Sequence, residues 1–372
     1  MGAYELGLQS NGLKDFSVTI DGVQLTLSQT KSLKMKWNIN NFKVLGEIVF
    51  EDLANMVENL PIRGNNTVVM TMTDFDDIPS KQEFKVTDVM YTRTKKGHPA
   101  VKLTLVDPIT LTAMQMYNEM SWKKEDMVNI IDHDETLKPD LVVKKKDFFS
   151  PEYKHENFVM PLHVPFNVVA HWLAKHNNVL WYQTRDDYVL QPLKELFGRG
   201  KQGEKFRYKT HNMLYRRRIY EYRANYGKLI ETNAFQTDGK VASFSPDSKH
   251  AKWEVNSFKK SLEDISSTGL TPQDLPGTGD KHFYKSDYNI KEVTEFMWQK
   301  NAYKGLELEI LVPGQFDTNI GDIVELDLVN YNKDTEPEAN INGLWLIEEI
   351  VDLINPPDFV QRIKLTRAKF SK

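Results

Sequence analysis

The sequence predicts an α+β fold that is mainly β, with small antiparallel β-barrels at both ends of the chain and an α/β section between them. Three observations predict it: alternating strands near the C-terminus, a weaker alternation over residues 1–110, and helical spacing in residues 111–203. Side chains of a strand point alternately to its two faces, so an alternating run places an apolar row on one face and a charged row on the other.

The C-terminal section carries the strongest of these patterns. The strands expected there are Leu306–Val312, Ile323–Val329, Gly343–Val351 and Phe359–Leu365. Turn residues at Pro313-Gly314, at Gly321-Asp322 and in the polar stretch 332–342 separate them. Short antiparallel strands so closely spaced predict a small barrel domain.

Residues 1–110 predict an N-terminal barrel. The expected strands are Phe16–Leu27, Phe42–Phe50, Thr67–Thr73, Phe84–Thr92 and Ala100–Val106. The last of them alternates cleanly and is ended by Asp107-Pro108, because proline cannot donate to a strand ladder.

Helical spacing appears in residues 111–203. Helices are expected at Leu111–Tyr117, at Lys123–Asp132 with Ser121 as its cap, and at Asn167–Lys175 after Pro165. An aromatic strand, Val179–Gln183, follows the last helix. These elements predict an α/β middle domain.

Residues 206–235 return to a two-strand pattern, and residues 236–288 are polar and rich in turn residues. Apolar residues at helical spacing then predict a helix over Tyr288–Trp298. The chain between residues 236 and 304 is therefore expected to be a separate, turn-rich segment.

The formal net charge of −4 conceals two oppositely charged stretches. Residues 194–228 hold eleven Lys and Arg against three Glu, a net charge of +8, whereas residues 305–372 hold six bases and thirteen acids, a net charge of −7. If both stretches belong to one barrel, their charges can pair across strands or across a subunit boundary. Two solvated faces are the alternative.

Composition bounds the class of protein. The 372 residues, 40% of them hydrophobic, suffice for more than one core, and the absence of cysteine excludes disulfides and thiolate metal sites. No apolar run approaches the roughly 18–20 residues of a membrane span, and the first residues do not resemble a signal peptide. We expect a globular, multi-domain protein made in the cytoplasm, without a membrane span.

No motif gives positive support for an enzyme. Gly198–Gly203 matches G-x-G-x-x-G, but a strand rather than a helix is expected to follow it, which favours a flexible basic loop over a dinucleotide site. Asp132–Asp134 lacks further ligands at metal-site spacing, and His171 and His176 are five residues apart instead of four. We expect no catalytic residue, cofactor or metal.

An arginine and tyrosine cluster supports two interpretations. Arg216, Arg217 and Arg218 lie near Tyr220 and Tyr222, a mixture that suits stacking on single-stranded nucleic acid or packing in a protein interface. The pI of about 6.2 and the acidic remainder of the chain favour the interface.

The order of elements in the C-terminal section resembles a known family. An apolar strand, Pro313-Gly314, the Asn319–Asp322 corner, the strand Gly343–Val351 and a last paired strand ending in Leu365–Arg367 follow one another. The middle section adds a proline-led helix ending in Trp172-Leu173-Ala174 and then an aromatic strand. Together they are similar to the central hub proteins of phage baseplates and to the hub part of type VI secretion spike proteins.

The resemblance implies two tail-tube-like barrels in one chain. These are residues 1–110 and, discontinuously, residues 204–235 with 305–372, with residues 111–203 as the middle domain and 236–304 as an insertion in the second barrel. It also implies a virion protein that forms a homotrimeric, pseudo-sixfold ring in a contractile tail baseplate. Such a ring joins the tail tube or tube-initiator protein to the central spike, contacts baseplate wedge proteins and lets DNA pass.

The N-terminal barrel and the insertion carry no motif of the family. An acidic lumen would keep DNA from sticking, so some of four acids are expected to face the channel: Glu307, Glu309, Glu325 and Asp327. The candidate interface residues are Arg216, Arg217, Arg218, Tyr220 and Tyr222. The alternatives are a tail-tip hub of another phage or injection particle, a tail-associated cell-wall hydrolase, and a nucleic-acid-binding protein.

Overall fold

The computed structural model describes most of the two ends of the chain and parts of its middle. The described residues are 12–52, 62–93, 97–115, 121–126, 154–159, 164–176, 179–186, 188–192, 196, 201, 203, 205–208, 216–225, 239–245, 252–258, 306–330, 333–337 and 341–367. The helix predicted at 288–298, the Asp132–Asp134 motif and most of the Gly198–Gly203 loop lie outside them.

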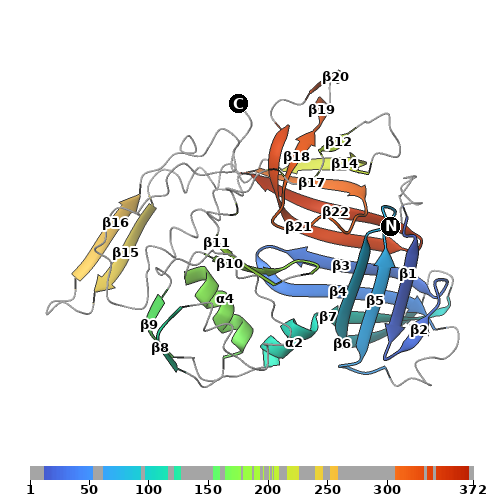
Figure 1. Ribbon diagram of the computed structural model, residues 1–372, viewed down its shortest axis with the longest axis horizontal. Helices are drawn as coiled ribbons and strands as arrows, with labels where there is room; N and C mark the ends of the chain where they lie inside the picture. The colour runs from blue at the N-terminus through green and yellow to red at the C-terminus, as the bar shows by residue number, and fades with distance from the viewer. Residues whose placement is uncertain are drawn as a thin grey trace.

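Strands dominate these residues (Figure 1). In the N-terminal part they are β1 (Asp15–Ile20), β2 (Val23–Leu25), β3 (Thr30–Asn38), β4 (Asn41–Glu51), β5 (Thr67–Thr73), β6 (Pro79–Arg93) and β7 (Pro99–Val106). The middle of the chain contains α2 (Pro108–Gln115), β8 (Ser121–Asp126), β9 (Lys154–Val159), α4 (Phe166–His176), β10 (Val179–Gln183), β11 (Tyr188–Pro192), β12 (Phe206–Tyr208), β13 (Arg218–Ile219), β14 (Glu221–Asn225), β15 (Gly239–Ser245) and β16 (Lys252–Phe258). The C-terminal part contains β17 (Leu306–Pro313), β18 (Ile323–Asp327), β19 (Val329–Asn330), β20 (Lys333–Pro337), β21 (Gly343–Asn355) and β22 (Asp358–Arg367).

The two ends of the chain share one large, almost entirely antiparallel sheet. Its main path runs β13-β12-β18-β21-β3-β4-β7-β6-β5-β1-β2, with β22, β17 and β14 branching from β21. Two small antiparallel β-barrel domains were predicted. The described strands instead form one large sheet without a closed barrel, because β21 pairs directly with β3 and joins the two ends. Figure 1 shows β21 and β22 lying beside β3 and β4, with β5 and β6 crossing them steeply.

The two ends of this sheet have the same strand order. In the N-terminal half the neighbours are β3-β4-β7-β6-β5, and in the C-terminal half they are β14-β17-β22-β21-β18. All of these pairings are antiparallel. The next strand differs, since β1 runs antiparallel to β5 whereas β12 runs parallel to β18.

A backbone corner recurs in both halves. The N–H of Asn65 donates to the carbonyl of Val86, and the N–H of Val86 donates to the carbonyl of Asn66. In the C-terminal half Gly321 donates to Ile347, and Ile347 donates to Asp322. The first residue of each corner has a positive φ, 77° for Asn65 and 84° for Gly321, a conformation that glycine and asparagine adopt most readily.

A β-bulge directly after this corner also recurs. The register between β6 and β7 shifts between Val86 and Asp88, and that between β21 and β22 shifts between Ile347 and Glu349. A bulge inserts one residue and bends its strand, and such features act as fixed parts of a fold. Strand order, corner and bulge together define a repeated framework, in which β3, β4, β5, β6 and β7 correspond to β14, β17, β18, β21 and β22.

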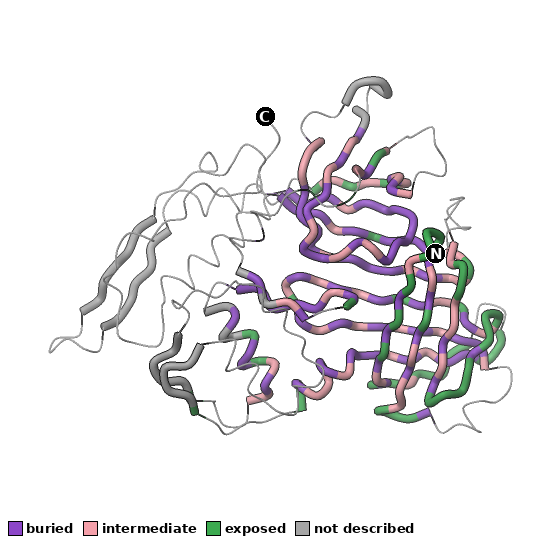
Figure 2. The backbone as a smooth tube through the Cα atoms, viewed as in Figure 1, coloured by how far each residue is buried: buried purple, intermediate pink, exposed green. Residues whose placement is uncertain are grey.

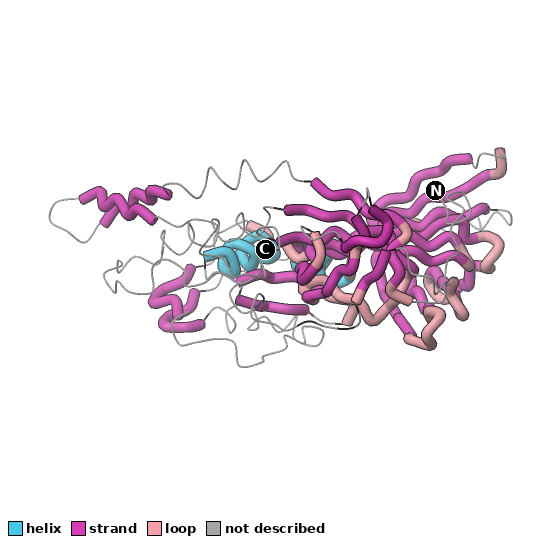
Figure 3. Tube along the Cα trace, turned by 90° about the horizontal axis from the view of Figure 1, so that it is seen from above, coloured by secondary structure: helices cyan, strands magenta, loops and turns pink. Residues whose placement is uncertain are grey.

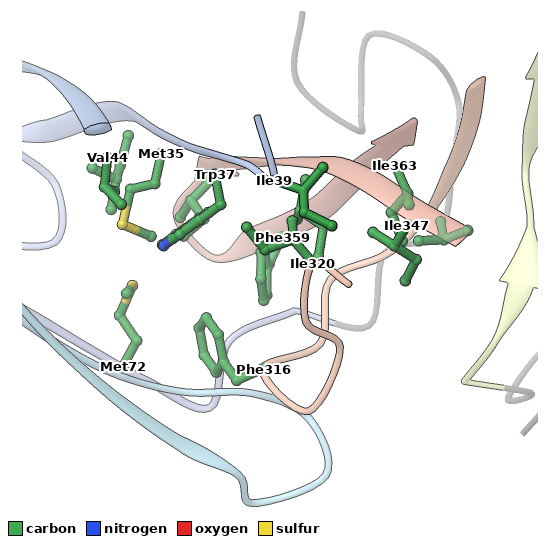
Figure 4. Packing of buried hydrophobic residues seen from close by; sticks show 14 of the residues in the cluster. Met35, Trp37, Ile39, Val44, Met72, Phe316, Ile320, Ile347, Phe359 and Ile363 are labelled. Atoms are coloured by element: carbon green, nitrogen blue, oxygen red, sulfur yellow. The ribbon is translucent and has the colours of Figure 1, made fainter. Parts of the chain in front are cut away.

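One hydrophobic core extends through both halves (Figure 2). Trp37 of β3, Phe316 of the β17–β18 loop and Phe359 of β22 are buried together, and Figure 4 shows their side chains directed toward one another. Aromatic side chains bury large apolar areas and therefore stabilise such a joint strongly.

Of the elements in the middle of the chain, α2, α4 and β10 lie beside this core (Figure 3), and α2 and β10 contact its strands. Trp181 of β10 stacks on Phe42 of β4 at 3.8 Å between ring centroids, and Leu180 and Tyr182 belong to the main core. Helix α4 packs between α2 and β10. The predicted helix at 167–175 and strand at 179–183 are confirmed.

Several predicted elements differ from the structure. The helix expected at Lys123–Asp132 was wrong for its described residues, because Ser121–Asp126 is the strand β8 and pairs with β9. The strand expected at Phe16–Leu27 is a hairpin that turns at Asp21-Gly22, both with positive φ. Strand β3 was not predicted, and part of the turn-rich stretch forms the β15–β16 hairpin.

Candidate assembly surface

The sheet has a groove on the face opposite the core, where the two halves meet. Its volume is about 430 Å³, and residues of β3, β4, β14, β17, β21 and β22 line it. Its charged lining residues are three bases and three acids: Lys34, Arg223, Arg362, Glu47, Glu221 and Glu309. The charged side chains of the lining therefore carry no net charge.

Each of the four acids predicted to face a channel has a basic neighbour in the same chain. Lys364 is 3.0 Å from Glu307, and the Arg362 Nε atom is 3.6 Å from Glu309. Lys201 and Lys205 lie 2.8 and 2.6 Å from Glu325. Arg207 Nε is 3.8 Å from Asp327.

The contacts of Lys201, Lys205 and Arg207 confirm that the basic and acidic stretches pair with each other, whereas those of Lys364 and Arg362 lie within the acidic stretch. Two hydrogen bonds lower the pKa of Glu325, the larger effect coming from Lys201 and the next from Lys205. Burial favours the neutral form of Lys364, but the attraction of Glu348 and the hydrogen bond to Glu307 outweigh it and raise the pKa of Lys364. Opposite charges across strands stabilise the sheet modestly at the surface.

The predicted arginine cluster divides into differently placed residues. Arg217 is buried, donates to Thr318 at 3.0 Å, and lies 5.1 Å from the centroid of the Phe206 ring. Arg216 contacts Asp317 at 2.5 Å and Asp76 of the β5–β6 turn at 3.5 Å. Arg216 and Arg217 therefore hold loops of this chain together, which reduces the charge available to phosphate.

The tyrosines of the predicted interface lie at the edge of the sheet. Tyr220 donates its backbone N–H to Leu311, its side chain packs with Leu311, Val360 and Leu353, and burial raises its pKa. The guanidinium of Arg218 donates to the Tyr220 hydroxyl at 3.2 Å. Tyr222 packs edge-on against Tyr208 at 5.1 Å between ring centroids.

Sequence reasoning missed a buried polar network at the joint between the halves. Arg185, which follows β10, donates two hydrogen bonds to Asp352 of β21, at 2.6 and 2.9 Å. Its guanidinium lies 4.3 Å from the centroid of the Trp37 ring, and its backbone carbonyl accepts from Gln82 of β6. Gln361 of β22 also donates to Asp352.

This network joins β3, β6, β21 and β22 with the middle of the chain. The only signal in the sequence was Asp352 itself, an acid within the apolar run Ile350–Ile354 and in register with other core positions. A buried carboxylate requires a partner, but the sequence does not indicate which of its bases supplies it.

The structure places no candidate metal centre in the part of the chain that it describes. In that part of the chain no group of three or more His, Cys, Asp or Glu side chains is placed to hold a metal ion. Phe206–Tyr208 after the glycine-rich loop is the expected strand β12. A search of the described helices finds none long and apolar enough to cross a membrane.

No protein-family model matches the sequence, and no curated protein matches it significantly. Solved structures do match. The 43 kDa tail protein of prophage MuSo2 from Shewanella oneidensis has a TM-score of 0.63 at 10% identity, covering 95% of this chain and 98% of that one. A tail protein from Neisseria meningitidis MC58 has a TM-score of 0.60 at 11% identity, covering 95% and 96%.

An Escherichia coli component of the type VI secretion system also matches, with a TM-score of 0.54 at 8% identity over 94% of this chain and 76% of that one. That protein is described as structurally similar to the T4 phage tail proteins gp27 and gp5. At these identities the likeness concerns the fold. The resemblance to phage hub proteins is confirmed at that level: this chain has the fold of phage tail and type VI spike-related proteins.

Proposed function

We propose that the chain is the central hub of a contractile phage tail baseplate. Three copies form a ring in which each contributes two like modules, so that the ring has threefold symmetry overall and approximate sixfold symmetry in its sheet. Such a ring joins a sixfold tail tube or tube-initiator protein to a threefold central spike, with wedge proteins around it.

The observation that carries this proposal is the repeated framework. The N-terminal and C-terminal halves share the order of five strands, a corner closed by corresponding hydrogen bonds, and a bulge at the corresponding residue. A chain with two like modules presents six of them to a partner when three copies assemble, which is the property that a joint between sixfold and threefold structures requires. The nearly full-length fold likeness to two phage tail proteins supports the same conclusion.

The groove face of the sheet is proposed to line the channel through which DNA passes. Glu309 lines this groove together with Arg223 and Arg362. Paired charges of both signs offer a polyanion neither a continuous basic track nor strong repulsion. A map of the assembled ring with Glu309 on its outer wall would overturn this placement.

The test of the proposal is the mass and shape of the purified chain. Light scattering is expected to give three times the 43.2 kDa of one chain. Negative-stain images are expected to show rings with six similar lobes. A monomer or dimer at every concentration, or a trimer without a central hole, would contradict the hub function.

A hub of a type VI or related injection particle is the second candidate, because the Escherichia coli secretion component shares the fold. Both candidates require the same ring, so mass measurement does not separate them. Co-purification with the tail tube and spike proteins encoded beside this gene separates them, because each particle has its own set.

A further inference from the structure

The second half of β6, Asp88–Arg93, has a described partner strand on one edge only. The corresponding part of β21 has a partner strand on each edge. After its bulge, β21 pairs on one edge with β22 and on the other with β3, from Glu349 opposite Asn38 to Ile354 opposite Leu33. After its own bulge, β6 continues from Asp88 to Arg93 and pairs with β7. Among the described strands, none pairs with the other edge of Asp88–Arg93.

Burial differs at corresponding positions of the two strands. Counted from the bulge, Met90 corresponds to Val351 and Tyr91 to Asp352. Met90 and Tyr91 are 53% and 64% exposed, whereas Val351 and Asp352 are 6% and 0% exposed. Two adjacent large apolar side chains on an open strand edge form a site that invites pairing with another strand.

The strand corresponding to β3 is β14, and no described strand pairs with its outer edge either. In the N-terminal half β3 pairs with β4 and β4 pairs with β7, and in the C-terminal half β14 pairs with β17 and β17 pairs with β22. Matching these pairings residue by residue places Tyr222 at the position of Leu33 and Ala224 at the position of Met35. Leu33 and Met35 are fully buried beside β21, whereas Tyr222 and Ala224 are only half-buried. Among the described strands, β14 pairs only with β17.

We propose that the second half of β6 in one copy of this chain pairs antiparallel with β14 of the next copy. The β21–β3 joint sets the register: Met90 lies opposite Asn225, Tyr91 opposite Ala224 and Thr92 opposite Arg223. Side-chain directions agree, because Ala224 and Val89, the neighbour of Met90, pack toward the core. Tyr91 then points to the core side and Met90 to the groove side.

The strand that pairs with the β6 edge comes from another copy of this chain, because the chain carries both edges of such a joint. The edge of β6 corresponds to that of β21, and the edge of β14 corresponds to that of β3. A pairing between two different patches is head-to-tail, so it closes into a ring when the rotation per copy allows it. The strand pairing requires only a second copy. Closure at three copies rests on the function proposed above.

A designed disulfide tests the register directly, because the chain has no cysteine of its own. In Met90→Cys/Asn225→Cys the two thiols lie on facing residues of neighbouring copies, within reach of a disulfide. Under oxidising conditions we expect covalent dimers and trimers on a non-reducing gel, lost on reduction. Both substituted residues are exposed, so the fold tolerates them.

Two matched variants serve as controls. Lys36→Cys/Val351→Cys probes the corresponding joint within one chain and is expected to give a crosslinked monomer, since these residues face each other. Met90→Cys/Ala224→Cys shifts the register by one residue, which turns one thiol to the opposite face of the sheet. That variant is expected to give no crosslinked oligomers.

The outcomes separate this inference from the hub function. Covalent rings of a number other than three would support the strand pairing and overturn the trimer. Trimers in light scattering without crosslinking of Met90→Cys/Asn225→Cys would overturn the pairing and leave the hub function standing. A disulfide formed within a single chain, or the absence of both crosslinks and oligomers, would overturn the pairing.

A second variant tests the edge without cysteines. Tyr91→Glu places a charge at a position that becomes buried in the pairing, so association is expected to weaken by about tenfold or more. Asp77→Lys, an exposed charge change in the β5–β6 turn, is the control and is expected to leave association unchanged. Equal effects of both variants would contradict a role for the β6 edge.

Discussion

The second halves of β6 and β21 follow equivalent corners and bulges, yet one is exposed and the other is buried. In β21 the core-facing position after the bulge is Asp352, held by Arg185 and Gln361 at the joint with β3. In β6 the same position is Tyr91, 64% exposed. The repeated framework therefore forms a joint within the chain at β21, whereas at β6 it leaves an edge that no described strand pairs with and that the proposed assembly would use.

The difference between these positions fits the two kinds of joint, one observed within the chain and one proposed between copies. A buried ion pair requires both partners to be in place during folding, which suits a joint made once within a single chain. An exposed methionine and tyrosine need no partner during folding and gain burial when a partner strand arrives.

The largest expected effect comes from Asp352→Ala, which leaves Arg185 buried without its carboxylate. The free energy of unfolding is expected to fall by about 3–5 kcal/mol, because an uncompensated buried charge is costly. Denaturant unfolding followed by circular dichroism measures it. The matched variant Tyr91→Ala changes an exposed side chain and is expected to lower the stability of the monomer by less than about 0.5 kcal/mol. Similar losses in both variants would contradict the comparison.

The two corners respond differently to substitution. Gly321→Ala is expected to destabilise by more than about 1 kcal/mol, because φ is 84° and the new Cβ would lie 2.6 Å from the Tyr182 hydroxyl. Asn65→Gly, at the corresponding and exposed corner, is expected to stay within about 0.5 kcal/mol of the parent. Thermal unfolding of the two variants checks this. A tolerated alanine at 321 would show that the corner is not rigid.

Glu325 gives the C-terminal half a pH dependence that the N-terminal half lacks at the corresponding residue, Val69. The folded pKa of Glu325 lies below its usual value of 4.5, so its contribution is present above that pH and lost as pH falls through the folded pKa. Glu325→Gln is expected to be less stable than the parent at pH 7 and to approach it in acid. An unchanged difference down to low pH would contradict this pairing.

The smallest effect is expected at two equivalent surface ion pairs. Lys102 lies 2.8 Å from Glu47 in the N-terminal half, and Arg362 lies 3.6 Å from Glu309 in the C-terminal half. Lys102→Met and Arg362→Met are each expected to cost less than about 1 kcal/mol, and less at high salt. A much larger loss for one of them would show that the framework is not equivalent there.

Alternating patterns predicted much of the fold. Strand β5 and most of β4, β7, β17, β21 and β22 follow their apolar rows, and α4 follows its helical spacing and Pro165. Strand β3 was missed although its apolar residues alternate with lysines, and the Asp21-Gly22 hairpin signal was overlooked. The helix expected near Ser121 failed because pairing with β9 overrides a weak capping signal.

The candidate site was less accessible to sequence reasoning. Charge counts offered pairing between the basic and acidic stretches as one of two alternatives, and the contacts of Lys201 and Lys205 with Glu325 are examples of such pairing. They did not predict the Arg185–Asp352 pair or the correspondence of β6 with β21. Both depend on which distant strands pair and in which register, and that is set by the folded sheet.

Hydrogen exchange of the two equivalent strand halves tests the central claim most directly. The amides of Glu349–Ile354 are expected to exchange slowly at every protein concentration, since they lie inside the joint. Of the amides of Asp88–Arg93, those directed away from β7 are expected to exchange quickly in the dilute monomer and slowly once the chain assembles. Protection of Asp88–Arg93 that does not change between monomer and assembly would contradict the account.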